Sequence, residues 1–288
     1  MADRKQLQVR LMQPLEVQLA LDWAGREGWN PGLNDAIAFY AADPNGFLVA
    51  EIDGEPIGCI SAVRYGDRFG FIGLYIVSPQ WRGRGYGMQL WESAWSRLLH
   101  RLDPERASIG LDGVVEREST YRKAGFQSAY RHVRHVCDPV PSERVPDEAI
   151  PLTNLPLDLI ASYETNLFPA SRPQFLKPWI QAAEAAYGIV ECDRLWGYGV
   201  IRRCVRGFKI GPLFADTFEI AEMLFRSLIH HAEGQAVFID IPDINSSASL
   251  LIERYNLQPV FTCVRMYWGS QPNLDVDRIF GVTTLELG

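Results

Sequence analysis

A buried strand, a loop rich in glycine and arginine, and a helix follow one another between Tyr75 and Trp91, and this segment constrains the fold most strongly. It reads YIVSPQWRGRGYGMQLW. Alternating glycines let the backbone turn tightly and leave amide N–H groups unshielded. Such groups at a helix N-terminus, where the helix dipole favours negative charge, form an anion site. Arg82 and Arg84 add full positive charges. The segment therefore predicts a pyrophosphate cradle between a strand and a helix.

The spacing of the loop excludes two common phosphate-binding folds. A dinucleotide-binding fold has GxGxxG directly after its first strand, and a P-loop has GxxxxGK[ST]. Here the pattern is GxGxG after the third expected strand. The chain is acidic, with a formal net charge of −7, although basic residues dominate between Arg82 and Arg134. Nucleic-acid binders normally carry a basic excess. We therefore expect a small polyphosphorylated ligand and no nucleic-acid partner.

The order of expected elements divides the 288 residues into two similar halves. Residues 138–156 hold five prolines, which break regular structure. We expect an N-terminal domain at 1–138, a proline-rich linker at 139–156 and a C-terminal domain at 157–288. Hydrophobic periodicity predicts helices and strands in both halves. In the first half the helices are 17–27, 35–42, 87–102 and 116–123, and the strands 47–52, 57–65, 71–77, 107–111 and 127–136. In the second half the helices are 157–167, 175–186, 217–232 and 245–255, and the strands 194–203, 207–213, 236–241 and 260–268.

Cysteine usage and hydropathy bear on location. The five cysteines are scattered, with no CxxC pair, which argues for a reducing compartment and against a disulfide framework or a zinc site. The longest uncharged stretch, from Phe69 to Trp81, is shorter than the roughly 20 residues of a spanning helix. We expect a cytoplasmic protein without a membrane partner or a bound metal.

The motif between Val77 and Gly87 resembles the acetyl-CoA-binding motif of the GNAT superfamily of N-acetyltransferases, in which V-x-P precedes R-G-x-G-x-G. A second block, YRKAGF at 121–126, is similar to the Y-x-x-x-G-F block of that family. The resemblance covers Val9 to Val136. A two-domain subgroup, with blocks like 22–32 and 279–288, resembles the whole chain. The implied fold is α/β, with three layers and a mixed central sheet, in tandem GNAT-like domains of which the second is degenerate.

By this resemblance, the first half holds acetyl-CoA as co-substrate and the second does not. The second half lacks RGxGxG at 211–216 and has Ile252 where the catalytic tyrosine would stand. In the first half, Tyr121 occupies the position of the general acid that protonates the departing thiolate. Val114 stands where the family often has asparagine. The resemblance implies CoA contacts from Tyr75, Ile76, Val77, Arg82, Gly83, Arg84, Gly85, Tyr86 and Gly87.

The identity of the general base is open at the level of sequence. An alkyl amine has a pKa near 10.4, so at neutral pH roughly one molecule in a few thousand is neutral and able to attack a thioester. A base must assist. Asp112, just past a strand end, and Glu27, in the first helix, are candidates. The Gly288 carboxylate is a third, because the related enhanced-intracellular-survival acetyltransferases use their chain terminus as base.

The acceptor is expected to bind near the first two helices, as in GNAT folds, where Trp23, Trp29, Asn30 and Asp35 are candidates. Two tryptophans beside carboxylates could hold a cationic amine. The favoured function is acetyl transfer to a primary amine of a small molecule, by a monomer or homodimer. The alternatives are a non-catalytic CoA-binding or small-molecule sensor, and a modifier of protein lysines or N-termini; an RNA-directed modifier is disfavoured by the acidic charge.

Overall fold

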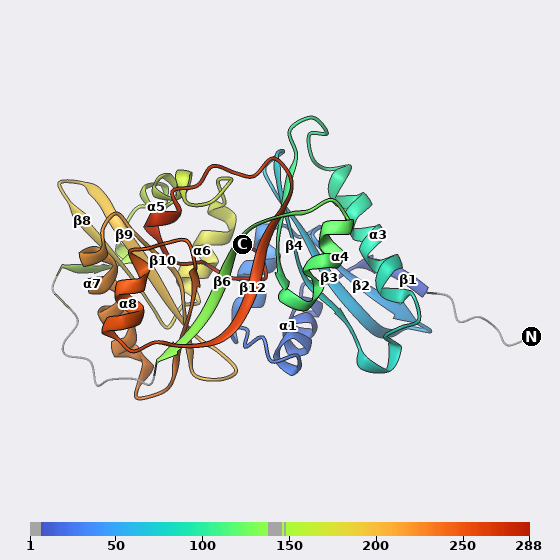
Figure 1. Ribbon diagram of the computed structural model, residues 1–288, viewed down its shortest axis with the longest axis horizontal. Helices are drawn as coiled ribbons and strands as arrows, with labels where there is room; N and C mark the ends of the chain where they lie inside the picture. Colours follow the sequence, from blue (N-terminus) through green and yellow to red (C-terminus); the bar gives the residue numbers. More distant parts are fainter. Residues whose placement is uncertain (1–6, 138–145, 147) are drawn as a thin grey trace, which may run out of the picture.

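A single mixed sheet runs through both halves of the chain (Figure 1). The computed structural model describes residues 7–137, 146 and 148–288. The strands are β1 (Leu7–Leu11), β2 (Phe47–Ile52), β3 (Glu55–Tyr65), β4 (Phe69–Val77), β5 (Ser108–Val114), β6 (Gln127–Cys137), β7 (Ala149–Pro151), β8 (Ala185–Glu191), β9 (Arg194–Arg203), β10 (Phe208–Ala215), β11 (Val237–Pro242), β12 (Gln258–Gly269) and β13 (Ile279–Gly281). The helices are α1 (Glu16–Arg26), α2 (Asp35–Ala42), α3 (Tyr86–Leu99), α4 (Glu118–Lys123), α5 (Leu157–Tyr163), α6 (Pro173–Gln181), α7 (Phe218–Ile229) and α8 (Ala248–Arg254).

The two halves exchange their last long strands. The strand order is β1-β2-β3-β4-β5-β12-β6-β11-β10-β9-β8-β7, with β13 beside β10. Strand β12 therefore pairs with β5 of the first half, and β6 pairs with β11 of the second. The two exchanged strands also pair with each other, and they cross the centre of the molecule in Figure 1. The exchange makes the sheet continuous, so each half completes the other.

Helices cover both faces of the sheet and give three layers. On one face, α1 and α2 share a hydrophobic core with α5 and α6, so this core extends across both halves. On the other face, α3 and α4 pack over β2–β5, and α7 and α8 pack over β8–β11 in a separate core. The fold class predicted from the sequence, α/β with three layers and a mixed sheet, is confirmed.

Some sequence predictions need correction. The helix expected at 175–186 ends at Gln181, and Ala185 begins β8, because this segment pairs with β9. The chain before 17 also holds a strand, β1, which pairs with β2. Residues 138–145 and 147 of the predicted linker region lie outside the described residues; its later part contains β7, paired with β8. The domain boundaries at 138 and 157 stay predictions.

Candidate active site

A cavity of about 460 Å³ lies where β4 and β5 separate. These two parallel strands pair only as far as Ile72 and Leu111. Beyond that point, Gly73–Val77 of β4 and both Asp112 and Val114 of β5 line the cavity. Its volume lies within the range of about 300–1,000 Å³ that small-molecule sites occupy. The gap between the two strands therefore has the size of a small-molecule site.

A β-bulge in β4 lies where the two strands separate. Cys59 and Ser61 of β3 pair with Ile76 and Gly73, so two residues of β4, Leu74 and Tyr75, lie opposite one residue of β3. Leu74 adopts the left-handed region, with φ 47°. A bulge bends its strand and leaves the extra residue outside the regular ladder. The edge of β4 that faces the cavity is thereby freed from β5 along the segment predicted to bind an extended ligand.

The predicted phosphate loop has the geometry of an anion cradle. Gly83 and Gly85 have φ values of 75° and 84°, which only glycine adopts without strain, and Gly85 is the N-cap of α3. The N–H groups of Gly83, Arg84 and Gly85 have no hydrogen-bond partner among the described residues. The first N–H groups of α3, from Tyr86 onward, are free by helix geometry. The loop that carries these donors borders the cavity, because Gly83 and Gly87 line it.

Arginines surround the mouth of the cavity. Arg82 donates from Nε to the carbonyl of Val77 (2.7 Å) and from Nη2 to Glu27 (2.5 Å). Arg84 is exposed and lies 5.2 Å from the ring centre of Trp81. Arg117, which the sequence analysis did not assign to the site, also lines the cavity. The positive charge of these arginines suits a polyanionic ligand. Glu27, one of the candidate bases, is already paired with Arg82.

Tyr121 lies on the α4 side of the same cavity. Its ring contacts Trp91, with centroids 5.8 Å apart, and lies so close to β5 that a Cβ at Gly113 would come within 2.7 Å of it. Burial raises the pKa of the Tyr121 phenol to about 12, and nearby Tyr75 adds to this effect. The phenol is therefore fully protonated near neutral pH, as a proton donor must be.

Asp112 is held by partners from the exchanged strands. Its side chain is fully buried, accepts two hydrogen bonds from Arg265 of β12 (2.7 and 2.9 Å), and pairs with His132 Nδ1 of β6 (2.9 Å). Burial alone would raise the pKa of Asp112, but Arg265 and His132 lower it overall. A carboxylate stabilised in this way is a weak proton acceptor, so its geometry does not favour the base role predicted from the sequence.

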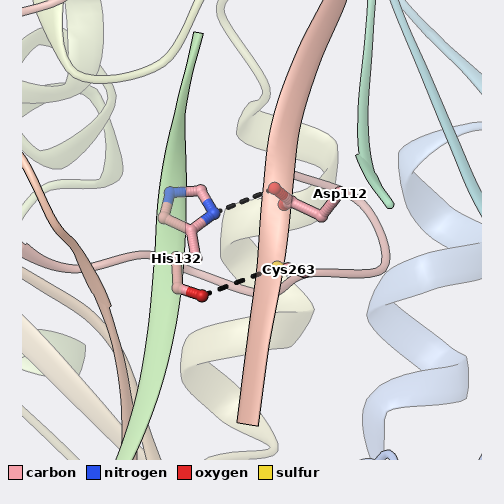
Figure 2. Close-up of side chains that lie close together, drawn as sticks. All are labelled: Asp112, His132 and Cys263. Atoms are coloured by element: carbon pink, nitrogen blue, oxygen red, sulfur yellow. Dashed lines mark hydrogen bonds and ion pairs between the residues drawn. The ribbon is translucent and has the colours of Figure 1, made fainter. Parts of the chain in front are cut away.

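Three potential metal ligands meet beside Asp112. Donor atoms of Asp112, His132 and Cys263 lie within 4.8 Å of one another (Figure 2). Both oxygens of Asp112, however, already accept hydrogen bonds from the positively charged Arg265. Burial also raises the pKa of the Cys263 thiol well above its usual value, and the sulfur lies near the carbonyl of His132. We interpret the cluster as a polar network that joins β5, β6 and β12.

Of the four candidate acceptor residues, only Trp29 lines the cavity. Trp23 packs into the core with 8% of its surface exposed. Asn30 hydrogen-bonds the backbone of the loop after β9. Asp35 is buried and forms an ion pair with Arg202 (2.5 Å), at a separate cavity of about 300 Å³. The second half supplies the partners in both cases, which sequence periodicity does not reveal.

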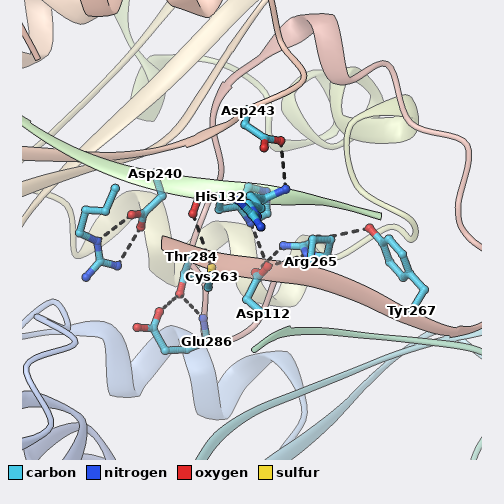
Figure 3. A network of polar contacts seen from close by, with 11 residues as sticks. Asp112, His132, Asp240, Asp243, Cys263, Arg265, Tyr267, Thr284 and Glu286 are labelled. Atoms are coloured by element: carbon cyan, nitrogen blue, oxygen red, sulfur yellow. Dashed lines mark hydrogen bonds and ion pairs between the residues drawn. The ribbon is translucent and has the colours of Figure 1, made fainter. Parts of the chain in front are cut away.

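The C-terminal segment supplies cavity residues that the sequence analysis missed. The chain ends at the centre of the molecule (Figure 1), and Leu285 and Glu286 line the cavity. Figure 3 shows the Glu286 carboxylate beside Thr284, near the Asp112 network. Gly288, the third candidate base, is not among the lining residues; Arg172 Nη1 lies 3.4 Å from its oxygen. Glu286 is the only acidic residue in 279–288. This is the one feature of the sequence that could have indicated a role for it in the site.

Further lining residues without a role predicted from the sequence include Thr120, Arg134, Phe261 and Cys263. Two of them come from β12, so the second half forms one wall of the cavity. The second half shows no equivalent of the phosphate loop at 211–216, because β10 continues to Ala215 and the Thr217 side chain caps α7, where Oγ1 accepts from the Ile220 N–H (3.4 Å). The donors of that helix start are thus partly satisfied within the chain.

Comparisons with known proteins agree with this geometry. Residues 15–126 match the model of the acetyltransferase (GNAT) family, and residues 160–281 match that of an acetyltransferase (GNAT) domain. The chain is 30% identical to the holothin acyltransferase of Pseudoalteromonas sp. (strain SANK 73390) over 276 residues, which cover 95% of this chain and 92% of that protein. It is 23% identical to the uncharacterized N-acetyltransferase YitH of Bacillus subtilis (strain 168), over 77% of this chain and 78% of that one.

Solved structures show the same fold. A putative acetyltransferase from Pyrococcus horikoshii superposes with a TM-score of 0.82 at 22% identity, covering all of this chain and 98% of that one. A tandem GNAT protein from the clavulanic acid biosynthesis pathway gives a TM-score of 0.63 at 14% identity, covering 92% of this chain and 100% of that one. The chain belongs to the GNAT family of acyltransferases and carries two GNAT domains in tandem.

Proposed function

We propose that this acyltransferase moves an acetyl group from acetyl-CoA to the primary amine of a small acceptor. The observation that carries the proposal is one cavity that connects the loop at 82–87, the free edge of β4 and Tyr121. A pyrophosphate binder, an edge for an extended amide chain and a proton donor fit the pyrophosphate, the pantetheine arm and the departing thiolate of acetyl-CoA. Bound acetyl-CoA supplies the thioester carbonyl that an amine attacks.

The residues of the first half fit the donor. The N–H groups of Gly83 to Gly87, aided by Arg82 and Arg84, would hold the pyrophosphate. The free edge at Tyr75 to Val77 would pair with the amides of the pantetheine arm as an added strand does. Arg82 already occupies the carbonyl of Val77, so the remaining edge groups would make this pairing. This arrangement would direct the thioester toward the gap between β4 and β5.

Tyr121 is positioned to complete the reaction. When the amine nitrogen bonds to the thioester carbon and the C–S bond breaks, the sulfur leaves with its electron pair as a thiolate. The buried phenol of Tyr121, protonated at neutral pH because its pKa is raised to about 12, would give this thiolate its proton. Proton transfer by a positioned side chain typically contributes about 10²–10⁴-fold in rate.

The acceptor is a small amine in this proposal. The cavity volume suits a small molecule, and the relative that is 30% identical to this chain is named holothin acyltransferase. Holothin is therefore a first acceptor to test on this chain, beside simple primary amines. We place the reaction in the cytoplasm, in keeping with the five free cysteines. The described residues include no helix that could cross a membrane.

Calorimetric titration of acetyl-CoA tests donor binding. We expect the wild type to bind and the Arg82→Ala, Arg84→Ala double variant to bind at least about tenfold more weakly, because two charge-assisted contacts of at least about 1.4 kcal/mol in total are lost. Arg68→Ala, an exposed change elsewhere in the same half, is the control and should leave the affinity unchanged. Absence of binding to the wild type would overturn the proposed function.

Release of free CoA thiol in the presence of holothin or 2-phenylethylamine tests turnover. Tyr121→Phe should lower kcat by about 10²–10⁴-fold, since the proton donor is lost, while acetyl-CoA affinity stays within about twofold of the wild type. Full activity of Tyr121→Phe would contradict the assigned role. Acetyl-CoA binding by the wild type without thiol release for any amine would favour the sensor instead.

A further inference from the structure

We propose that the carboxylate of Glu286 binds the ammonium group of the acceptor and takes its proton, which marks the acceptor end of the cavity. The inference rests on the proposed function and adds the missing base. Glu286 lines the cavity while only 5% of its surface is exposed. It comes from the end of the second half, so the catalytic site would draw residues from both halves (Figure 3).

The charge balance around the cavity supports this assignment. The other two carboxylates of the cavity lining are paired, Glu27 with Arg82 (2.5 Å) and Asp112 with Arg265 (2.7 Å). Among the described residues, Glu286 forms no ion pair within 4 Å, and only one of its oxygens, Oε2, has a hydrogen-bond donor, the Thr284 hydroxyl. A buried charge is costly unless it is paired. An acceptor ammonium would supply a cation in direct contact with the Glu286 carboxylate.

Cations also lie behind Glu286, and most of them are already engaged. Arg134 of β6 is bound by Asp240 of β11 (2.7 Å) and Arg202 of β9 by Asp35 (2.5 Å). Lys209 of β10 is buried without a hydrogen-bond partner among the described residues; burial and Arg134 lower its pKa, while Glu286 and Asp240 raise it. Arg134 lines the cavity but is neutralised by Asp240, and Lys209 and Arg202 do not line it. A ligand amine therefore reaches Glu286 without displacing an ion pair.

The backbone fixes Glu286 beside the expected position of the thioester. The Glu286 carbonyl lies so close to β4 that a Cβ at Gly73 would overlap it. Gly73 is the first residue of β4 after the pairing with β5 ends at Ile72. Tyr65 donates to the carbonyl of Leu287 (3.2 Å), and the Gly288 N–H donates to the carbonyl of Thr284 (3.1 Å). The segment is thus held where the two strands part.

The apolar part of the cavity lining also indicates the class of acceptor. Trp29, Phe261, Cys263 and Leu285 line the same cavity as Glu286. Aromatic and aliphatic side chains in a cavity with one carboxylate outside any ion pair suit a primary amine on an apolar body, because the body loses contact with water while the ammonium keeps a partner. We therefore expect 2-phenylethylamine to be a better acceptor than an amine of similar size that carries a carboxylate.

The proton inventory of the step is balanced. Glu286 takes one proton from the ammonium, and the neutral nitrogen forms the N–C bond at the thioester carbon. The nitrogen of the resulting intermediate loses a second proton, the C–S bond breaks, and Tyr121 protonates the sulfur. The second proton from the nitrogen replaces the one that Tyr121 gave to the sulfur, so the phenol is restored. The proton on Glu286 passes to solvent. No oxidant or further reactant is needed.

The test compares the pH dependence of thiol release with 2-phenylethylamine in the wild type and in Glu286→Gln. At pH 7 the variant should lose about 100-fold or more in kcat/KM, with acetyl-CoA affinity within about twofold of the wild type. Its rate should rise nearly tenfold per pH unit up to about pH 9, because only free neutral amine then reacts. The wild-type rate should rise less steeply. Glu253→Gln, an exposed change in the second half, should behave as the wild type.

Each alternative outcome has a separate meaning. If the wild type turns over and Glu286→Gln stays within about threefold of it at pH 7, or its deficit does not shrink with pH, this inference is wrong and the proposed function stands. If the wild type releases no thiol with any amine, both fail. If Glu286→Gln loses acetyl-CoA affinity, the Glu286→Asp variant is the deciding test. It should have a lower kcat but keep the shallow pH dependence of the wild type. A steep pH dependence of Glu286→Asp would overturn proton transfer to the carboxylate.

Discussion

The carboxylates that line the cavity have different roles, and Asp112 shows why a carboxylate at this site need not be a base. Both of its oxygens are taken by Arg265, and His132 adds a third contact. Such a group is ionised because its partners stabilise the charge, and the same partners weaken it as a proton acceptor. Glu286 differs, because one of its oxygens has no donor among the residues that the structure describes and is open to a ligand. The two carboxylates line one cavity. Their different surroundings support a structural role for Asp112 and the proposed chemical role for Glu286.

We expect Asp112→Asn to lower the free energy of unfolding by about 3–5 kcal/mol at neutral pH, because it leaves Arg265 buried without its anion. The pKa of Asp112 is lowered in the folded protein. Its contribution is therefore complete above its unfolded pKa of about 3.9 and is lost as pH falls through the lower folded value. Denaturant unfolding at pH 7 and at pH 5 should show the same deficit. Glu105→Gln, an exposed change, should show none.

At the scale of elements, three local devices build the cavity: the bulge in β4, the glycine loop before α3, and the C-terminal segment seated on β4. The loop at 82–87 was predictable because its chemistry is contained in six consecutive residues. The seat of the C-terminal segment was not, because it depends on a contact between residues 73 and 286, which are far apart in the chain. The absence of a side chain at Gly73 is what permits the approach.

We expect Gly73→Ala to disturb the site through the C-terminal segment. A Cβ at 73 would overlap the carbonyl of Glu286, and overpacking of this kind typically costs about 1–3 kcal/mol of stability. Thiol release should fall at least about tenfold as Glu286 moves, with acetyl-CoA affinity changed less than the rate. Gly25→Ala, where a Cβ would meet Val205 at an ordinary 3.6 Å, is the matched control. Equal behaviour of the two variants would contradict the proposed seat.

At the scale of the whole molecule, the exchange of β6 and β12 explains which predictions held. Most of the order of helices and strands was predictable from periodicity, and the fold class and the family were predictable from the motifs at 75–91 and 121–126. The partners of Asp112 and Asp35 were not, since Arg265 and Arg202 lie more than 150 residues away and reach them only because the halves share one sheet. Trp29 stays a candidate at the cavity, whereas Asn30 and Asp35 serve the junction between the halves.

The exchange makes each half incomplete alone, and we expect neither 1–146 nor 147–288 to fold separately. Without β12, the first half exposes the edge of β5 and leaves Asp112 buried without Arg265; without β6, the second half exposes the edge of β11. Unpaired edges and unpaired buried charges both destabilise a fold. Each fragment expressed alone should be insoluble or lack cooperative thermal unfolding, and the two expressed together should form a 1:1 complex that binds acetyl-CoA. A soluble first half with full acetyl-CoA affinity would show that the shared sheet is dispensable, because the phosphate loop and β4 would then be organised without any residue of the second half.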